Sequence, residues 1–256
     1  MDLGLTGKRA LVLGASRGLG MAIAQGLAAE GAEVFAAARN LDAIRAWSDG
    51  TPNVHPVKAD VSDIAAVDAL AESLLADGGV DILVNNAGGP PPGTALGAKR
   101  EDWTEHFQTM AANLFHLTGR LLPAMQERGW GRVITIASSG VEQPIPNLAL
   151  SNGIRSAVVG WSKTLASEVA KDGVTVNVVL PGRIHTQRVD ELDAAAAKRT
   201  GKPVEDVASA SAAAIPAGRY GRPEEFADVV VFLASERASY LTGSRVRVDG
   251  GAIRAV

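Results

Sequence analysis

The sequence predicts a single α/β domain built on a doubly wound, parallel sheet of about seven strands. Short apolar runs alternate along the chain with longer stretches of helical periodicity. The first apolar run, residues 10–13, is unbroken, as is typical of a strand buried on both faces. No linker rich in proline or serine and no block of charge divides the 256 residues. We therefore expect one domain with right-handed crossovers between its strands.

The first strand runs directly into a glycine turn. Gly14, Gly18 and Gly20 follow it, and apolar residues at four-residue spacing then form one stripe of a helix. Glycine lets the backbone turn tightly and lets a phosphate approach amide donors at the helix N-terminus, where the helix dipole favours negative charge. This strand, turn and helix predict a dinucleotide-binding site.

The remainder of the first half continues the alternation. We expect strands at residues 33–38, 54–58 and 82–84, and helices at residues 41–47, 64–76 and 101–127. The sequence Asp60-Val61-Ser62-Asp63 offers N-cap residues for the helix that begins at residue 64. A loop rich in proline and glycine, residues 90–93, precedes the long helix.

The second half keeps the same rhythm with one interruption. We expect strands at residues 133–136, 174–180 and 245–248, the last at a sheet edge, and helices at residues 147–170 and 223–234. Residues 186–217 are rich in alanine and interrupt the strands, with helical propensity at 193–198 and 204–214. We expect this segment, about 186–217, to form a helical lid over the ligand crevice.

Composition and charge exclude several classes of protein. The formal net charge of −3 argues against the positively charged surface that nucleic-acid-binding proteins use. No apolar run approaches membrane-spanning length. The absence of cysteine removes disulfides, thiolate catalysis and cysteine metal sites, and we expect no metal. The short apolar run after Lys8 and Arg9 is not a signal peptide. We expect a cytoplasmic protein with no nucleic-acid or membrane partner.

Four motifs, taken together in this order, resemble the short-chain dehydrogenase/reductase family, particularly its 3-oxoacyl carrier-protein reductase branch. They are Gly14-Ala15-Ser16-Arg17-Gly18-Leu19-Gly20, Asp60-Val61, Asn85-Asn86-Ala87-Gly88 and Pro181-Gly182-Arg183-Ile184-His185-Thr186. The resemblance covers residues 5–251 and implies a Rossmann-like fold. It also implies a set of residues that bind a nicotinamide cofactor: Gly14, Ser16, Arg17, Gly18, Leu19, Gly20, Arg39, Asp60, Val61, Asn86, Ala87, Gly88, Arg155, Pro181, Gly182, Ile184 and Thr186. Leu13 departs from the family, which usually has threonine before the first glycine, and should cost one local hydrogen bond.

The choice between NAD and NADP depends on charge at the end of the second strand. Proteins that bind NAD have a carboxylate there for the ribose hydroxyls, whereas proteins that bind NADP have an arginine for the 2′-phosphate. Here the strand ends in Ala37-Ala38-Arg39-Asn40, and Arg17 lies in the glycine turn. The alternative is that both arginines are merely solvated. We expect NADP(H).

The catalytic pattern that the resemblance implies is only half present. Asn113 falls on the family's asparagine, and Ser138 or Ser139 falls on its carbonyl-polarising serine. Counting back from residues 160–166 puts Ser151 at the position of the family's tyrosine and Arg155 at that of its lysine. The spacing of four, which puts both side chains on one helix face, is retained.

These replacements change the chemistry of the site. A serine hydroxyl is far less acidic than a phenol and shorter by a ring, so Ser151 is a poor proton donor. Arg155 can hold ribose hydroxyls but cannot shuttle protons. The only tyrosines, Tyr220 and Tyr240, lie far downstream, so no shift of alignment restores the pair.

Four other residues are weaker candidates for the missing acid or for the substrate mouth, and each also has a structural interpretation: His185, His116, Tyr220 and Glu142. Asp249-Gly250-Gly251 is more typical of a turn at a subunit contact than of a substrate site.

Three functions remain open. The first is an enzyme, an NADP(H)-dependent oxidoreductase resembling the carbonyl and 3-oxoacyl reductases, with a non-standard proton donor such as water held by Ser138, Asn113 and Ser151. The second is a catalytically silent NADP(H)-binding protein or sensor, and the third is a lyase resembling the halohydrin dehalogenases, which carry arginine at the position of Arg155. We favour the first, acting on a small carbonyl-type substrate.

The two long helices suggest self-association. They carry more small and apolar residues than we expect one sheet face to cover: Ala111, Ala112, Leu114, Leu117, Ala157 and Val158. We therefore expect a two-fold interface between copies of the chain, and the family resemblance adds the expectation of a homotetramer.

Overall fold

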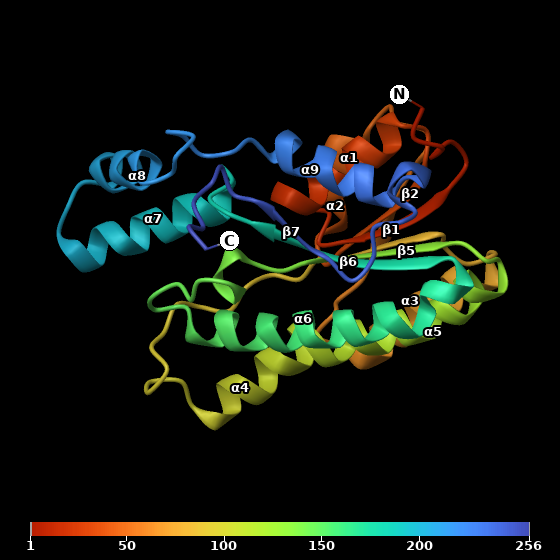
Figure 1. Ribbon diagram of the computed structural model, residues 1–256, viewed down its shortest axis with the longest axis horizontal. Coiled ribbons are helices and arrows are strands. Elements are labelled where there is room, and N and C mark those ends of the chain that lie inside the picture. Colours follow the sequence, from red (N-terminus) through yellow and green to blue (C-terminus); the bar gives the residue numbers. More distant parts are fainter. Residues whose placement is uncertain (1, 256) are drawn as a thin grey trace.

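The computed structural model describes residues 2–255, which form one seven-stranded sheet (Figure 1). The strands are β1 (Arg9–Leu13), β2 (Glu33–Ala38), β3 (Val54–Lys58), β4 (Ile82–Asn85), β5 (Gly131–Ile136), β6 (Val174–Pro181) and β7 (Arg245–Val248). Their order is β3-β2-β1-β4-β5-β6-β7, and every neighbouring pair is parallel. The predicted single-domain, doubly wound sheet is confirmed. Strand order reverses between β1 and β4, the place where such sheets bind ligands.

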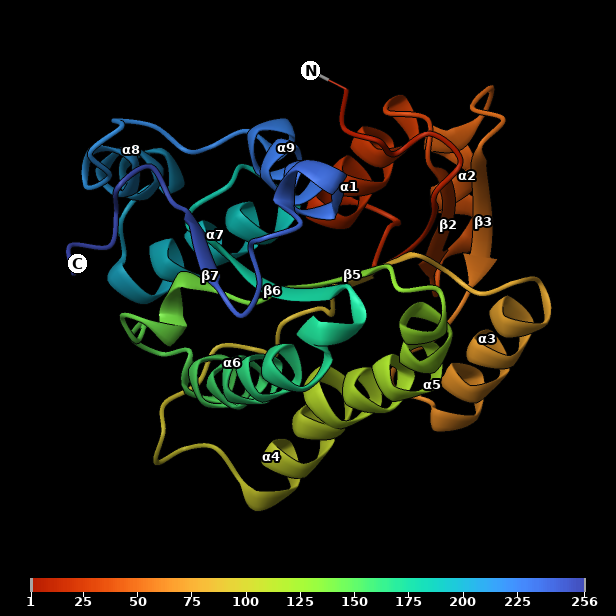
Figure 2. The ribbon, with the colours of Figure 1, turned by 45° about the vertical axis from the view of Figure 1, so that its right-hand side comes forward.

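Helices cover both faces of this sheet. They are α1 (Gly18–Ala29), α2 (Leu41–Ser48), α3 (Ile64–Ala76), α4 (Arg100–Phe107), α5 (Asn113–Glu127), α6 (Ala149–Val169), α7 (Gln187–Thr200), α8 (Val204–Ala213) and α9 (Pro223–Ala234). Figures 1 and 2 show α1 and α9 on one face and α3, α5 and α6 on the other. Each face has its own apolar core, because the strands between them are buried on both sides.

Helix α1 and helix α9 pack closely above the sheet. Ile23 and Leu27 of α1 and Phe226 and Val230 of α9 are fully buried in one cluster with the inner side chains of β1 and β2. Such burial stabilises a large aliphatic or aromatic side chain by about 1.5–3 kcal/mol. The helix that carries the glycine turn is therefore held rigidly against the sheet.

The long helix expected at residues 101–127 is interrupted. Between α4 and α5 lies a π-helical turn, Gln108–Ala112, which ends immediately before Asn113. A π turn inserts an extra residue and bends the helix, and such turns occur often at functional sites. The periodicity of apolar residues does not reveal this π turn, because the apolar stripe of the helix continues after it in α5.

Two other boundaries differ from expectation. Helix α6 begins at Ala149 instead of residue 147, because Asn147 has a left-handed backbone with φ of +61°. Helix α7 begins at Gln187, six residues earlier than the alanine-rich core of that segment suggested. The expected helical content of residues 186–217 is otherwise present in α7 and α8.

The carboxyl ends of the strands gather the functional segments. The loop after β4, the loop after β5 and the pair α7–α8 all lie at the left end in Figure 1. Within residues 2–255, none of the helices combines the length and apolar character needed to cross a membrane.

Candidate active site

The glycine turn has a geometry that only glycine satisfies. Gly14 and Gly18 have φ of +64° and +57°. A Cβ atom on Gly20 would lie 2.2 Å from the carbonyl oxygen of Gly14, and one on Gly14 would lie 2.7 Å from Nδ2 of Asn86. Asn86 Nδ2 in turn donates to the Leu13 carbonyl at 3.2 Å. The motif after β1 and the motif after β4 therefore meet at the point where strand order reverses.

Two basic side chains lie together at the ends of β2 and β3. Arg39 and Lys58 line an open hollow of about 500 Å³ with Asn40, Leu41 and Asp42. Ala38 pairs with Lys58 across the two strands and Arg39 follows Ala38, so both basic residues stand at the carboxyl ends of neighbouring strands. The sequence analysis assigned no role to Lys58, although its place at the end of the predicted third strand was a usable signal.

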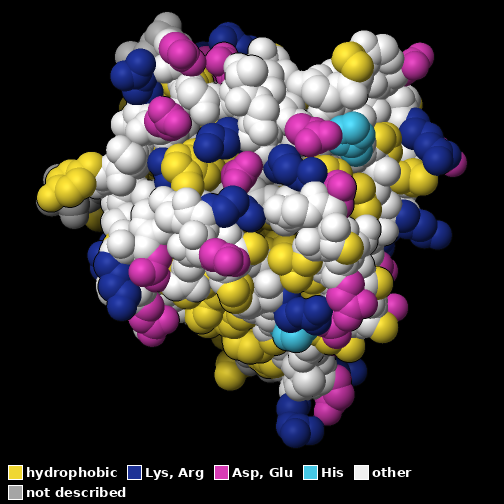
Figure 3. Space-filling view, turned by 90° about the vertical axis from the view of Figure 1, so that its right-hand side faces the viewer, with side chains coloured by type: hydrophobic (Ala, Val, Ile, Leu, Met, Phe, Trp, Pro, Cys, Tyr) yellow, Lys and Arg dark blue, Asp and Glu magenta, His cyan; other side chains and the backbone are white. Residues whose placement is uncertain are grey.

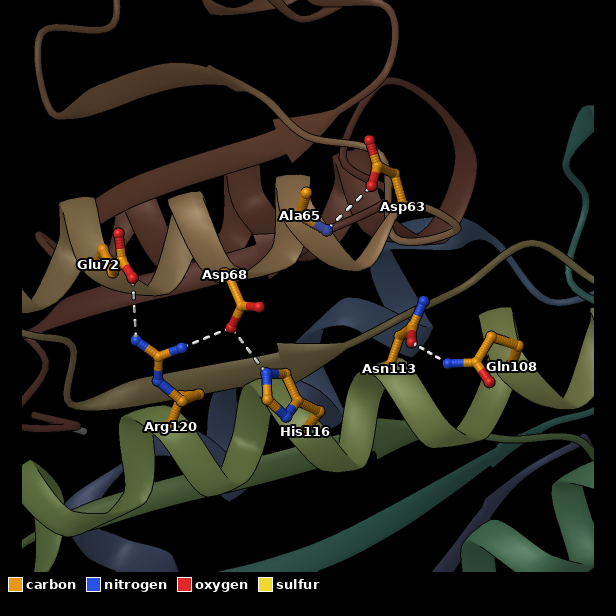
Figure 4. A network of polar contacts seen from close by, with 8 residues as sticks. All are labelled: Asp63, Ala65, Asp68, Glu72, Gln108, Asn113, His116 and Arg120. Atoms are coloured by element: carbon orange, nitrogen blue, oxygen red, sulfur yellow. Dashed lines mark hydrogen bonds and ion pairs between the residues drawn. The ribbon is translucent and has the colours of Figure 1, made fainter.

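Asp60 and Asn113 position the neighbouring loop. The Ser62 hydroxyl and amide both donate to Oδ1 of Asp60, which lowers the pKa of that carboxyl, and the charge of Arg39 lowers it further. Buried Asn113 donates from Nδ2 to the Val61 carbonyl at 2.7 Å, and its Oδ1 accepts from Gln108 Nε2 at 2.5 Å (Figure 4). The bond to Gln108 spans the π turn, so the bend and the loop after β3 support each other.

His116 points away from Asn113, as Figure 4 shows. Its Nε2 lies 2.8 Å from Oδ1 of Asp68 on α3, which also accepts from Arg120 at 2.5 Å. The hydrogen bond from His116 is the main cause of the lowered pKa of Asp68. These contacts tie α5 to α3 and favour the structural interpretation of His116.

The candidate catalytic serines lie on two different elements. Half-buried Ser138 follows β5 in extended conformation, and its Oγ accepts from the Gly140 amide at 3.1 Å. Ser139 opens the short 3-10 turn Ser139–Val141. Buried Ser151 lies in the first turn of α6, with Arg155 one turn further along. Both elements start at the carboxyl edge of the sheet.

Arg155 bridges the ends of β4 and β5. Its Nη1 donates to the Ile136 carbonyl at 2.7 Å, and its Nη2 donates to the Ala87 carbonyl at 3.3 Å. Burial first, and the positive charge of Arg188 second, lower the pKa of Arg155 to about 10. The guanidinium therefore remains protonated at neutral pH.

The loop after β6 lies against the glycine turn. Its Ile184 forms an isolated β-bridge with Gly221, and Thr186 precedes α7 with its methyl carbon 3.6 Å from the place where Gly18 would carry Cβ. At Gly182 a Cβ atom would lie 2.6 Å from the Cα of Asp249, so this position also requires glycine. The fourth motif thus lies directly beside the glycine turn.

Two arginines connect α7 to the rest of the site, Arg188 of α7 itself and Arg17 of the glycine turn. Arg188 Nη2 donates to the Pro90 carbonyl at 2.9 Å. Arg17 hydrogen-bonds to Gln187 and lies 4.0 Å from Glu191. Arg188 received no predicted role, although it stands two residues after Thr186 in the fourth motif.

The other weaker candidates make structural contacts. Tyr220 donates to Oδ2 of Asp193 at 2.7 Å, and burial is the first cause of its raised pKa. Asp193, itself buried, also accepts from Arg183 at 2.5 Å. His185 is largely exposed and lies 3.5 Å from Asp190.

Glu142 and Asp249 are also occupied. Glu142 lies 3.6 Å from both Arg245 and Arg247 of β7. Asp249 accepts from the amides of Gly251 and Ile253 at 2.9 Å each, which stabilises its own turn. Among residues 2–255, no group of three or more His, Asp or Glu side chains could hold a metal ion.

Comparison with known proteins gives consistent results along the whole chain. The family model described as enoyl-(acyl carrier protein) reductase matches residues 14–252. The 3-oxoacyl-[acyl-carrier-protein] reductase FabG of Escherichia coli K12 is 39% identical over 249 residues, which cover 96% of this chain and 97% of that protein.

Solved structures are equally similar in fold. L-sorbose reductase from Gluconobacter frateurii, complexed with NADPH and L-sorbose, has a TM-score of 0.92 and 37% identity, with all of both chains covered. YwfH, an NADPH-dependent reductase involved in bacilysin biosynthesis, has a TM-score of 0.93 and 29% identity, covering 98% of this chain and 100% of that one.

Proposed function

Because the chain belongs to the short-chain dehydrogenase/reductase family of oxidoreductases, we propose that it is an NADP(H)-dependent reductase of a carbonyl-type substrate. Its proton donor is not the tyrosine of the family, since Ser151 stands at that position and Arg155 at the lysine position. The similarity to 3-oxoacyl reductases supports a carbonyl-type substrate, and the similarity to the NADPH complex of sorbose reductase supports the cofactor.

The residues of the crevice fit a phosphorylated dinucleotide. The glycine turn leaves room beside the N-terminus of α1 for a diphosphate, which the helix dipole and free amides stabilise. Arg39 and Lys58 supply two positive charges for a 2′-phosphate, while Asp42 in the same hollow is paired with Arg45 at 3.3 Å. This hollow is the observation that carries the choice of NADP(H). Asn86, Ala87, Gly88 and Thr186 would line the nicotinamide side.

The reactive end of the site offers hydroxyls and a fixed cation. The nicotinamide supplies the hydride when the cofactor is bound. Hydroxyl groups of Ser138 and Ser151 donate hydrogen bonds to the carbonyl oxygen, and Arg155 stabilises the negative charge that develops there. Arg155 does not release its proton. A water molecule held by these hydroxyls and by the segment around Asn113 instead protonates the alkoxide oxygen and regains a proton from solvent. This arrangement polarises a carbonyl but lacks a strong acid.

The helical segment 186–217 serves as the lid of this site. Arg188 joins α7 to the loop after β4, and Arg17 joins the glycine turn to α7. Opening would break these few polar contacts while leaving the sheet intact.

The test combines cofactor binding with turnover. Titration with NADPH and NADH, followed by nicotinamide fluorescence, should show tighter binding of NADPH. A panel of ketones and 3-oxoacyl thioesters, followed by nicotinamide absorbance, should then show slow reduction. Absence of NADPH binding would overturn the proposal.

A second candidate, a silent NADP(H)-binding protein, follows from the replaced tyrosine and lysine positions. Tight NADPH binding with no turnover on the entire panel would favour it. The lyase alternative rests on Arg155 alone, and release of halide from halohydrins without any cofactor would support it instead.

A further inference from the structure

We infer that the substrate of the proposed reaction carries a carboxylate, held between the guanidinium groups of Arg155 and Arg188. This inference rests on the proposed function for the identity of the reaction, and it adds a class of substrate. The two guanidinium groups lie near one another, Arg155 has no acidic partner among residues 2–255, and neither residue belongs to the glycine turn or to the Arg39–Lys58 hollow.

The two guanidinium groups converge above Gly89. A Cβ atom built on this glycine would lie 3.5 Å from Nη2 of Arg188 and 4.0 Å from Nη2 of Arg155. Gly89 is exposed and has no side chain of its own to stand between the two guanidinium groups. A planar carboxylate placed there would accept hydrogen bonds from both forks.

Arg155 has an unmatched charge. Its guanidinium carries five donors, of which two are used by the Ile136 and Ala87 carbonyls. Within residues 2–255 no carboxylate lies within 4.0 Å of it, and its charged neighbour is Arg188, of the same sign. A half-buried, partly desolvated cation without a counter-ion is costly, and an anionic ligand would reduce that cost.

Arg188 is only weakly compensated. Its side chain is 42% exposed and it donates to the Pro90 carbonyl, while Nη1 lies 3.7 Å from Glu191. Glu191 is shared with Arg17 at 4.0 Å. The acidic side chain at the end of the 3-10 turn, Glu142, is already paired with two arginines of β7. The crevice beside Gly89 is therefore positively charged.

The position of the pair points to the substrate as the source of the anion. The features suited to cofactor phosphates are the glycine turn after β1 and the Arg39–Lys58 hollow at the ends of β2 and β3. Arg155 instead lies at the ends of β4 and β5, one helical turn after Ser151. An anion held there would lie beside the reactive carbonyl.

The test compares oxo acids with their methyl esters. Pyruvate, acetoacetate and levulinate, and the methyl ester of each, would be titrated by calorimetry into the protein with and without saturating NADPH. At least one acid should bind about tenfold or more tightly than its ester to the NADPH complex, since a charge-assisted hydrogen bond is worth roughly one to two decades in affinity.

Variants of α7 separate this role from a structural one. Arg188→Gln should reduce the preference for the acid by about ten- to a hundredfold, and Arg188→Lys should restore part of it. Glu191→Gln should raise the affinity for the acid by about two- to fivefold, because it removes a competing carboxylate. Arg199→Gln, on the exposed last turn of α7, is the matched control and should change neither affinity.

Several outcomes would overturn the inference: equal affinity for every acid and its ester, equal weakening of both by Arg188→Gln, or an acid that competes with NADPH for the same site. Failure of NADPH to bind, with a preserved preference for the acid, would overturn the proposed function and leave the carboxylate site standing. NADPH binding with ester reduction and no preference for any acid would overturn the carboxylate site and leave the proposed function standing.

Discussion

At the scale of residues, Arg155 does what a lysine at the same position could not. Its planar fork reaches two carbonyl oxygens at the ends of adjacent strands and keeps further donors for a ligand. A lysine would present a single compact ammonium that lowers the pKa of a neighbouring phenol. With Ser151 in place of that phenol, Ser151 and Arg155 can bind the substrate and polarise its carbonyl group, but they do not supply a proton.

The double substitution Ser151→Tyr with Arg155→Lys should raise turnover of simple ketones by roughly two to four decades, the usual contribution of general acid catalysis. The phenol and the ammonium act as a unit, so each single substitution should do much less. Steady-state kinetics with saturating NADPH would measure this. A well-folded double variant that binds NADPH and gains no activity would contradict the expectation. Fast turnover by the unmodified protein would also contradict it, because another residue would then supply the proton. His185→Ala and Tyr220→Phe would be the next variants to test for that residue.

Arg39 should decide the preference between cofactors. Arg39→Ala should weaken NADPH binding by about 1.5–3 kcal/mol, roughly one to two decades, because a charge-assisted bond to the 2′-phosphate is lost. NADH affinity should change little, since NADH lacks that phosphate. Fluorescence titration measures both affinities. Lys58→Ala should act in the same direction, and Arg100→Ala, at an exposed arginine at the start of α4, is the control. Equal affinities of the unmodified protein for the two cofactors would rule the assignment out.

At the scale of elements, the start of α9 is held by a single carboxylate. Glu225 accepts from the Arg222 amide at 2.7 Å and from both terminal nitrogens of Arg219, at 2.8 and 2.7 Å. The Arg219 hydrogen bonds first, and the Arg222 amide second, lower the pKa of Glu225 to about 2. This contact joins the segment after α8 to the helix that covers β1.

The contribution of Glu225 to stability should depend on pH. Its pKa is lower in the folded protein than the ordinary 4.5, so the carboxylate stabilises the fold above about pH 4.5 and the effect is lost as the pH falls toward 2. Glu225→Gln should therefore unfold at lower temperature than the unmodified protein at pH 7, and the difference should shrink between pH 4.5 and 2. Thermal unfolding followed by circular dichroism measures this. Glu224→Gln, exposed in the same turn, is the control, and a pH-independent difference would contradict the argument.

At the scale of the whole molecule, part of the reasoning for self-association was wrong. Ala111, Leu114, Leu117 and Val158 are buried within one copy of the chain, because α5 and α6 press them against the sheet. Only Ala112, half-buried, and Ala157, exposed, remain available among the six residues that suggested an interface.

Aromatic residues now carry the prediction of an oligomer. Phe115 of α5 stacks on Trp161 of α6 with ring centroids 4.1 Å apart, both only partly buried, and Phe107 is 40% exposed. Figure 3 shows hydrophobic side chains gathered toward the lower part of one face, on the side of the helical layer that includes α5 and α6 in Figure 1. Exposed apolar surface of this kind often marks an interface.

We expect a dimer or tetramer in light scattering, and Trp161→Arg should shift it toward the monomer. Charge placed at a two-fold contact is repeated on both copies, so its cost is doubled. Tyr240→Arg, at a fully exposed aromatic residue, is the matched control and should leave the assembly unchanged. A monomer at every concentration of the unmodified protein would refute the prediction.

The sequence by itself determined the succession of strands and helices along the chain, the glycine turn and the edge position of β7. These features depend on local patterns: an unbroken apolar run for a buried strand, glycine where φ is positive, and alternating charge on a half-exposed strand. The resemblance of residues 160–166 to the family motif also assigned Ser151 and Arg155 to the tyrosine and lysine positions, and their spacing of four places both side chains on one helix face.

Only the tertiary structure decided which charges lie together. Lys58 stands beside Arg39 because β3 pairs with β2, and Arg188 faces Arg155 because α7 folds back over the loop after β4. Asn113, directly after the π turn, likewise donates to the Val61 carbonyl, 52 residues away along the chain. Such contacts join segments that no local periodicity relates, since they follow from strand order and from the crossovers that pack each helix on its face of the sheet.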